Sequence, residues 1–349
     1  MRRHAAKMVV PATVLAAALG AGLAGPAWAT ASVSTNRLAG PDRFATAAAI
    51  ASGTFTSART AIVASGADPN FPDAIASSYL AGNTTAPVLL TDPASLSSAT
   101  QNELKTLGVS GVDVVGGPNA VSDNVVSQLK ALGYVVDRIA GATRYSTAAA
   151  VAEAPGSTPV GSLPSQGRTA LLATGENFPD ALTGGPVAYA DSFPTLLTET
   201  ATLAPEASGA MDNLAIKHVI VLGGPLAVSD TVVSQVQAKG ITVERLAGQN
   251  RQQTATAISD FELSRLGFPG IHVNLARGDN FPDALAGGPH GGHEGAAILL
   301  TSTPDSLGAD TDAYLRAHTS TIASIDVFGG PLAVSDATVA AAQKAAENG

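Results

Sequence analysis

The sequence contains no cysteine, so it has no disulfides, and its stability must come from buried apolar area. Aromatic residues make up only 4% of the chain, and the single tryptophan, Trp28, lies close to the N-terminus. Binding modules for neutral sugars commonly stack sugar rings on Trp or Tyr. The shortage of these side chains therefore disfavours a neutral sugar as the ligand.

Basic residues are also scarce, at 19 Lys and Arg against 28 Asp and Glu, which gives a net charge of -9. Without Arg2, Arg3 and Lys7 the balance is 16 against 28, or -12. A net acidic protein is a poor candidate for binding nucleic acid or anionic membranes. An anionic ligand would have to be met by local arginines or by backbone N–H groups.

The N-terminal segment has the pattern of an export signal. A basic start, MRRHAAK, precedes an apolar run and the small-residue site Ala27-Trp28-Ala29. We predict a signal peptide over residues 1–29, cleaved after Ala29, with Ala31 as the second candidate. The alternative, a retained membrane anchor, is disfavoured because the run is short and contains Pro11. We expect a secreted protein with no membrane association after signal removal, held at the cell surface by non-covalent binding.

Three motifs recur in the same order, with spacings of 101 to 107 residues. R-x-A-G begins at Arg37, Arg138 and Arg245; NFPDA begins at Asn70, Asn177 and Asn280; and GGPxAVSD begins at Gly116, Gly223 and Gly329. The boundaries that follow are residues 30–134, 135–241 and 242–349. No low-complexity linker separates these repeats, so we expect them to be packed together.

Within each repeat, short runs of Val, Ile and Leu alternate with longer helical segments. In the second repeat the expected strands are 134–140, 169–174, 194–198 and 218–224, and the expected helices are 144–154, 178–190, 205–215 and 229–240. Apolar runs without polar alternation are typical of strands buried on both faces. The pattern predicts an α/β fold in which each repeat has a parallel four-stranded sheet with helices on both faces.

The NFPDA motif raises the question of whether it is catalytic. Asn177 and Asp180 have the spacing of an N-cap and an acidic third residue, which predicts the start of a helix with Pro179 in its first turn. The alternative is a carboxylate pair, Glu176 with Asp180, or Asp279 with Asp283, for metal or acid/base chemistry. We favour the structural interpretation, because no invariant His, Cys or Lys accompanies the motif. The small-residue segment that follows predicts close backbone packing.

The arginines give the stronger functional signal, because each repeat carries R-x-A-G-x-x-R. An arginine in the first turn of a helix opposes the helix dipole, so its recurrence there requires a reason. Arginine beside free helix N–H groups makes a receptor for phosphate or carboxylate. We predict a ligand site at these residues: Arg37, Arg43, Arg138, Arg144, Arg245 and Arg251. A salt bridge between repeats, for example to the NFPDA aspartate, is the other interpretation, and both can hold.

Two further motifs carry weaker signals. The GGPxAVSD loop follows a strand and could face a ligand, but it lacks the G-x-G-x-x-G order and the P-loop lysine of nucleotide sites. His290, His293 and Glu294 could hold a metal only in the third repeat, and the surrounding glycines disfavour that. No Ser-His-Asp or G-x-S-x-G signature supports a hydrolase. We predict no catalytic residue, metal or cofactor.

The R-x-A-G-x-x-R-x-x-T-A opening, NFPDAL, the P-x-L-L-T strand and the V-x-G-G-P-x-A-V-S-D ending together resemble the cell wall-binding repeat 2 family. The resemblance implies three Rossmann- or Toprim-like parallel-sheet units packed as a pseudo-threefold trimer. It also implies non-covalent attachment to anionic polymers of Gram-positive walls. The strand that the family associates with wall attachment corresponds to 87–91, 194–198 and 297–301; the third copy lacks the proline. Family members often add an enzymatic domain; we expect none here, because the three repeats account for the residues after the predicted signal peptide.

The prediction is therefore a secreted, non-catalytic protein that binds an anionic cell-wall polymer or a peptidoglycan-linked glycan through three repeats. We expect a monomer with an internal pseudo-trimer, because three weak sites on one body gain affinity along a repeating polymer. The alternative is an exported hydrolase that uses the NFPDA carboxylates. The residues expected to support the ligand site are Asn70, Asp73, Asn177, Asp180, Asn280, Asp283, Thr91, Thr198 and Thr301. In particular, we expect the three aspartates to orient arginines of an adjoining repeat.

Overall fold

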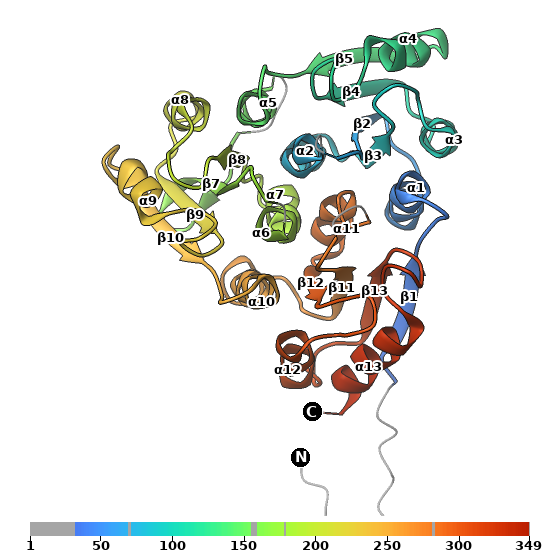
Figure 1. The fold of residues 1–349 in the computed structure, drawn as a ribbon, viewed down its shortest axis with the longest axis vertical. Helices are drawn as coiled ribbons and strands as arrows, with labels where there is room; N and C mark the ends of the chain where they lie inside the picture. The colour runs from blue at the N-terminus through green and yellow to red at the C-terminus, as the bar shows by residue number, and fades with distance from the viewer. Residues whose placement is uncertain (1–31, 69–70, 155–158, 178, 281–282, 349) are drawn as a thin grey trace, which may run out of the picture. The chain divides into compact units, whose positions relative to one another are not determined.

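Strands and helices alternate along the chain as the sequence predicts (Figure 1). The computed structural model describes residues 32–348, except 69–70, 155–158, 178 and 281–282, so the predicted signal peptide and Asn70 lie outside the described residues. The strands are β1 (Ser34–Leu38), β2 (Thr60–Ser65), β3 (Val88–Thr91), β4 (Gly111–Val115), β5 (Val135–Ile139), β6 (Ser162–Leu163), β7 (Gly167–Thr174), β8 (Thr195–Thr198), β9 (His218–Leu222), β10 (Thr242–Leu246), β11 (His272–Arg277), β12 (Ala297–Thr301) and β13 (Ser324–Phe328).

The helices between these strands are mostly short, and one ends in a π-helical turn. The helices are α1 (Arg43–Thr54), α2 (Pro72–Thr84), α3 (Ser98–Thr106), α4 (Asp123–Ala131), α5 (Arg144–Ala152), α6 (Pro179–Thr183), α7 (Gly185–Ala190), α8 (Pro205–Asn213), α9 (Asp230–Gln237), α10 (Arg251–Phe261), the turn η1 (Glu262–Leu266), α11 (Gly287–Glu294), α12 (Ala309–Ala317) and α13 (Asp336–Glu347). In the part of the chain described, every helix is too short or too polar to cross a bilayer.

The strands form three separate parallel sheets, which confirms the predicted α/β class. Their orders are β3-β2-β4-β5, β8-β7-β9-β10 and β12-β11-β13-β1, and β6 adds a short antiparallel edge to β7. β9, a central strand, is buried along its whole length, and the four residues of β3 and of β8, at the edges of their sheets, are all buried as well. Such strands need cover on both sides of the sheet, which is why their sequences do not alternate with polar residues.

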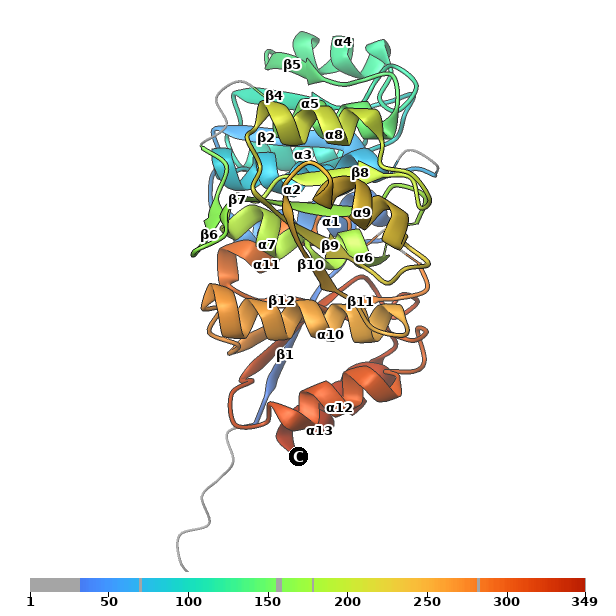
Figure 2. The same cartoon turned by 90° about the vertical axis from the view of Figure 1, so that its left-hand side faces the viewer.

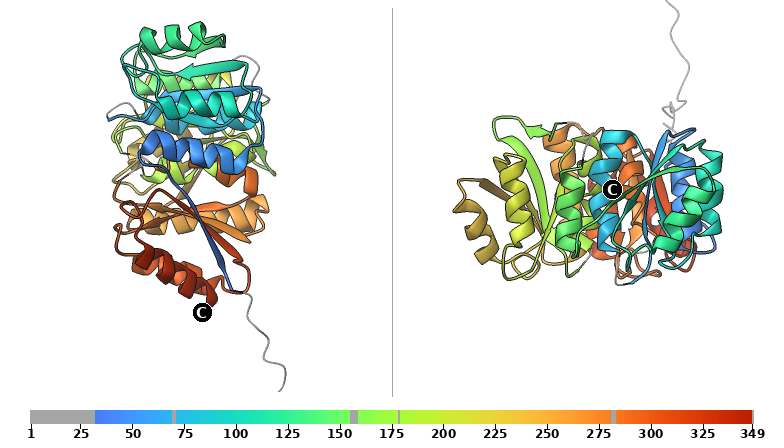
Figure 3. Two further views of the ribbon diagram at one scale, coloured as in Figure 1. Left: turned by 90° about the vertical axis from the view of Figure 1, so that its right-hand side faces the viewer. Right: turned by 90° about the horizontal axis from the view of Figure 1, so that it is seen from above.

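The first strand of each repeat belongs to the sheet of the preceding repeat, which the sequence analysis did not anticipate. β5 of the second repeat pairs with β4, β10 of the third pairs with β9, and β1 of the first pairs with β13. Figure 2 and the left view of Figure 3 show β1, in blue, running beside the red strand β13. The chain therefore closes on itself, and every repeat is completed by a strand from the next.

The helix that follows each exchanged strand also packs on the preceding repeat. α5 contacts α2, α10 contacts α6, and α1 contacts α11. The helices α2, α7 and α11, one from each repeat, contact one another pairwise. Their small residues permit this: a Cβ on Gly288 would lie 2.2 Å from Ser78 Oγ and 3.1 Å from Gly185 Cα. The predicted close backbone approach is confirmed, while the pseudo-threefold arrangement stays a prediction.

The helical segment after NFPDA differs from the prediction in two of the repeats. In the second repeat it is divided at Gly184 into α6 and α7, because Pro186 lacks the N–H that would continue the helical hydrogen bonding. In the third repeat residues 283–286 form a turn, and α11 begins only at Gly287. In the first repeat Phe71 occupies the N-cap position and α2 begins at Pro72, so the spacing that suggested an asparagine N-cap at Asn177 does not apply there.

Candidate binding pockets between the repeats

Three equivalent pockets lie where one repeat meets the next. We call them the 1–2 pocket, the 2–3 pocket and the 3–1 pocket after the repeats that form them; their cavity volumes are about 320, 420 and 440 Å3. Each is lined by the NFPDA aspartate and the GGPxA loop of one repeat, and by the segment from the glycine of R-x-A-G to the second arginine of the following repeat. The three motifs that recur in the sequence thus line the same cavities.

The position of the pockets follows from the sheet topology. In the first sheet β2 and β4 are neighbours, but the chain leaves β2 toward β3 on one side and leaves β4 toward β5 on the other. The carboxyl ends of parallel strands at such a reversal are where α/β proteins bind ligands. The GGPxA loop follows β4, and the helix α2, which carries the NFPDA aspartate, follows β2. The exchanged strand then brings the arginine segment of the next repeat to the same edge.

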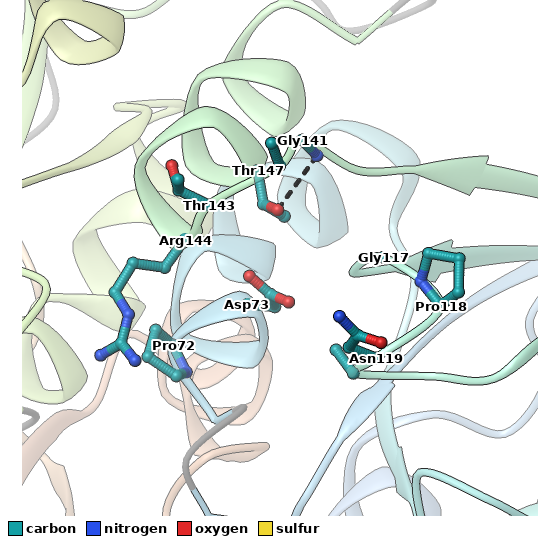
Figure 4. Close-up of a pocket in the computed structure, with 11 residues that line it drawn as sticks. Pro72, Asp73, Gly117, Pro118, Asn119, Gly141, Thr143, Arg144 and Thr147 are labelled. Atoms are coloured by element: carbon teal, nitrogen blue, oxygen red, sulfur yellow. Dashed lines mark hydrogen bonds between the residues drawn. The ribbon is translucent and has the colours of Figure 1, made fainter.

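The NFPDA aspartate lies at the centre of each pocket. In Figure 4 the carboxyl group of Asp73 lies between Thr147 and Asn119, with Arg144 at the edge. The Thr147 hydroxyl bonds this carboxyl and accepts a hydrogen bond from Gly141 N at 3.1 Å. Thr254 and Thr46 make the same pair of contacts in the other two pockets. Each aspartate is therefore joined through a threonine hydroxyl to the backbone of the following repeat.

The first position of the GGPxA loop has no room for a side chain, so glycine occupies it in all three repeats. Gly116 has φ +115°, a region that favours glycine, and a Cβ on it would lie 2.6 Å from Asp73 Oδ2. Gly223 and Gly329 have the same conformation and lie against the corresponding aspartates. The aspartate and the loop must therefore be close in all three pockets.

Burial changes the protonation of these carboxyl groups. It raises the pKa of Asp73 to about 6, although Arg144 and the Thr147 hydroxyl act in the opposite direction. Burial likewise raises the pKa values of Asp180 and Asp283, opposed in the first case by Thr254 and Arg251, and in the second by Thr46, Arg43 and Arg277. Each aspartate is thus within electrostatic reach of an arginine of the following repeat, and that it orients this arginine stays a prediction.

The second arginine of each repeat lines a pocket. Arg144 lies in the 1–2 pocket, Arg251 in the 2–3 pocket and Arg43 in the 3–1 pocket. Each also donates a hydrogen bond to the carbonyl oxygen of a glycine in its own repeat: Gly175, Gly278 and Gly66 respectively. This bond fixes the guanidinium group at the strand end. The third repeat keeps this arrangement, although Gln252 replaces the aromatic residue that follows the arginine in the other two.

The first arginine of each repeat lies outside the lining of the pockets and holds the exchanged strand. Arg37 pairs with Asp336 at 2.8 Å, Arg138 with Asp123 at 3.2 Å, and Arg245 with Asp230 at 3.1 Å. Each also donates to the carbonyl oxygen of the first glycine of the GGPxA loop. The predicted salt bridge between repeats therefore exists, but its partner is the aspartate of AVSD and not that of NFPDA.

The predicted supporting residues fall into two groups. Asn177 and Asn280 are exposed at the carboxyl end of their strands, and Asn177 lines the 2–3 pocket. Thr91 and Thr198 are fully buried, and each hydroxyl bridges the turn after its strand, to Ser95 O at 3.0 Å and to Thr202 O at 2.9 Å respectively. The Thr301 hydroxyl is also buried but has no hydrogen-bond partner in the described residues. These threonines shape the strand ends and are inaccessible to a ligand.

The 2–3 pocket continues into a second cavity of about 400 Å3. The second cavity also contains Glu176, and the two share five lining residues: Asn177, Pro179, Asp180, Leu226 and Ala227. Glu176 accepts hydrogen bonds from the backbone and the hydroxyl of Thr200, at 3.2 and 2.9 Å. The second repeat therefore offers a longer groove along its sheet edge, with two carboxyl groups in it.

The two histidines of the third repeat have separate roles. His290 is buried and joins Thr54 Oγ1, at 2.8 Å, to Asp326 Oδ2, at 3.1 Å. His293 is exposed and contacts the neighbouring Glu294. No group of three metal-ligating side chains occurs among the residues that the structure describes. His290 therefore connects the first repeat to the third.

Two sets of residues in and around the pockets were not singled out from the sequence. Thr46, Thr147 and Thr254 recur three residues after the second arginine, and that spacing was the available signal. The AVSD aspartates recur just as regularly, but each is the first residue of a helix, where an acidic residue has an ordinary explanation. Only the exchanged strand reveals their arginine partners.

Comparison with known families identifies the repeats. Residues 37–126, 138–233 and 245–339 each match Cell wall binding domain 2 (CWB2), and the chain belongs to this family. The resemblance predicted from the four motifs is confirmed, with three tandem copies.

Curated relatives and solved structures agree with this assignment. The chain is 31% identical over 274 residues to N-acetylmuramoyl-L-alanine amidase LytC of Bacillus subtilis, covering 78% of this chain and 51% of that protein. It is 30% identical to the Amidase enhancer of the same organism, covering 76% of this chain and 34% of that protein. Cwp6 from Clostridium difficile has the same fold, with a TM-score of 0.77 and 24% identity over 89% of this chain and 48% of that one. The chain thus spans about half the length of the amidase and of Cwp6.

Proposed function

We propose that this protein attaches non-covalently to an anionic polymer of the cell wall, or to a peptidoglycan-linked glycan, through the three inter-repeat pockets. The observation that carries the proposal is the recurrence of one pocket three times, each with an arginine at its edge and an aspartate at its centre that is buried in the 1–2 pocket and half-buried in the other two. The chain acts as a secreted monomer that is exported by residues 1–29, and it has no catalytic role of its own.

The charge distribution supports an anionic ligand. The chain as a whole is acidic, at -9, so attraction of an anion must be local. Arg43, Arg144 and Arg251 supply it, because each guanidinium group is held at a pocket by its bond to a glycine carbonyl. Guanidinium groups bind carboxylate and phosphate through paired hydrogen bonds. Three such sites on one body strengthen attachment to a repeating polymer.

The names of the relatives support attachment to walls. The repeat region of this chain is similar to part of an amidase and part of an amidase enhancer. The family to which the repeats belong is described as cell wall binding. Because the matched region is only about half of the amidase and a third of the amidase enhancer, their activities are not carried over to this chain.

A binding assay with isolated cell walls tests the proposal. The variant R43Q/R144Q/R251Q removes the three pocket charges, and we expect it to lose at least about tenfold in wall affinity. The matched control K105Q/K130Q/K217Q removes the same charge from exposed lysines and should bind as the wild type does. Circular dichroism and thermal unfolding establish that both variants are folded. Equal binding by the folded arginine variant would overturn the proposal.

The second candidate function is an exported hydrolase. One observation favours it: in the second repeat Glu176 and Asp180 share a cavity, and burial raises the pKa of Asp180. A raised pKa beside a second carboxylate is how glycosidases assign an acid and a base. Release of soluble sugar from isolated walls by the wild type, abolished in E176Q and D180N, would establish this function. We expect no release.

A further inference from the structure

Two leucines project into solvent at the rims of the pockets. Leu226 is 96% exposed and Leu332 is 90% exposed. The other exposed large apolar side chains of the described residues, among them Leu132 at 47% and Val135 at 69%, are much less exposed. A single exposed leucine is ordinary on a protein surface. Here the two most exposed ones occupy the same position of the GGPxA loop in two repeats.

The loop geometry keeps these side chains outward. Gly224, Pro225, Leu226 and Ala227 form a turn closed by the bond from Ala227 N to Gly224 O, at 2.9 Å. Proline at the second position of such a turn fixes the backbone, so the leucine at the third position is presented on a rigid support. The equivalent bond from Ala333 N to Gly330 O, at 2.8 Å, presents Leu332.

Each leucine lines a pocket together with charged groups. Leu226 lines the 2–3 pocket with Asp180 and Arg251. Leu332 lines the 3–1 pocket with Asp283 and Arg43. These two pockets therefore combine an apolar contact, a carboxyl group that can accept a hydrogen bond, and a guanidinium group. In the 1–2 pocket Asn119 takes the leucine position, so no leucine lines that pocket.

We infer that the 2–3 and 3–1 pockets are specific for an acidic polymer whose sugars carry N-acetyl groups, with Leu226 and Leu332 as the residues that recognise the acetyl methyl group. An acetamido group offers a methyl for the leucine, an N–H for the aspartate carboxyl and a carbonyl oxygen for a donor. The acidic group of the polymer pairs with Arg251 or Arg43. The 1–2 pocket lacks this preference because Asn119 provides no apolar surface. The inference rests on the proposed function and names the chemistry of its ligand.

The test measures binding to purified walls of the producing bacterium, before and after chemical removal of the N-acetyl groups. Wild-type protein should bind deacetylated walls about fivefold to tenfold more weakly. L226N/L332N should bind untreated walls with the same deficit and should lose little more on deacetylated walls. Because both side chains are almost fully exposed, these substitutions leave the core untouched. L132N, which replaces an exposed leucine outside the pockets, is the control and should behave as the wild type does.

A reciprocal variant and the possible failures complete the test. N119L should tighten binding to untreated walls and leave binding to deacetylated walls unchanged. If the wild type binds walls but L226N/L332N binds equally well, or if deacetylation has the same effect on both proteins, the inference is wrong and the proposed function stands. If the wild type does not bind walls at all, the proposed function fails and this inference fails with it.

Discussion

Arg37 and Asp336 lie 299 positions apart in sequence, and their side chains are 2.8 Å apart in space. Arg37 also donates to the carbonyl oxygen of Gly329, at 2.7 Å. These contacts fix β1 against β13 and join the first repeat to the third. Because Arg43 follows on the same segment, the 3–1 pocket depends on this closure.

The two contacts of Arg37 should differ in strength. The Arg37 side chain is 24% exposed and that of Asp336 is 84% exposed, so the ion pair is screened by solvent. We expect D336N to lower the free energy of unfolding by less than about 1 kcal/mol. R37A also leaves the Gly329 carbonyl without its donor, and we expect a loss of about 1–3 kcal/mol. Urea denaturation of both variants checks this. Equal losses would mean that the carbonyl contact contributes nothing.

The contact between α2, α7 and α11 should tolerate no added methyl group. G288A places a Cβ 2.2 Å from Ser78 Oγ, and we expect a loss of about 1–3 kcal/mol from overpacking. S78A/G288A removes the hydroxyl and should recover part of this loss. G209A is the control, because nothing lies within 4 Å of a Cβ there, and in a helix it should be neutral or slightly stabilising. Thermal unfolding of the three variants measures these changes. A G288A variant as stable as the wild type would contradict the packing account.

Glu262 should make the protein less stable as pH rises. It is fully buried, neither carboxyl oxygen has a hydrogen-bond partner among the described residues, and burial together with Asp191 raises its pKa well above the usual 4.5. Between that value and the raised pKa, the unfolded chain has lost the proton while the folded chain keeps it, so the unfolded state is favoured increasingly. E262Q keeps a neutral side chain and should remove this dependence.

The measurement for Glu262 is the unfolding midpoint as a function of pH. The pKa values of Asp73 and Asp191 are raised to about 6, and both groups contribute in the same direction, but only up to that pH. Every other titrating group is the same in E262Q, so the difference between the two curves above that pH reports Glu262. Parallel curves for E262Q and the wild type above pH 6 would contradict the assignment.

Binding of an anionic polymer should strengthen as pH falls. Above a pH of about 6 Asp73 is ionised and repels an anion in the 1–2 pocket, while below it the carboxyl is neutral. Asp180 and Asp283 act in the same direction because their pKa values are also raised. Wall affinity should therefore be higher at about pH 5 than at about pH 7.5, and D73N/D180N/D283N should flatten the profile near its upper level. If wall affinity depends on pH as steeply in the folded variant as in the wild type, the three aspartates do not face the ligand.

Much of the fold could be predicted from the sequence, because apolar runs and caps are local signals. The expected strand 218–224 is β9, at His218–Leu222, and the expected helix 205–215 is α8, at Pro205–Asn213. Which sheet a strand joins is not a local property. The strand 134–140 was assigned to its own repeat, but β5 pairs with β4 of the preceding one, since nothing in its composition records the partner.

The site could be predicted only in part, because it is formed by segments that are distant in sequence. The recurrence of arginine identified the right segment, and the aspartates were expected beside arginines of an adjoining repeat. Sequence could not separate Arg138, which holds a strand, from Arg144, which lines a pocket, because both occur in one motif. The sequence also could not show that Thr91 is buried, because an apolar strand pattern does not reveal which strand ends are accessible to solvent.

The most direct test of the central claim compares binding of the wild-type protein to intact walls with binding to walls stripped of their anionic polymers. Salt weakens contacts between exposed charges, so both measurements belong at one ionic strength. We predict strong binding to intact walls and little to stripped walls, because stripped walls offer no anionic group to the pocket arginines. Equal binding to both would contradict the account.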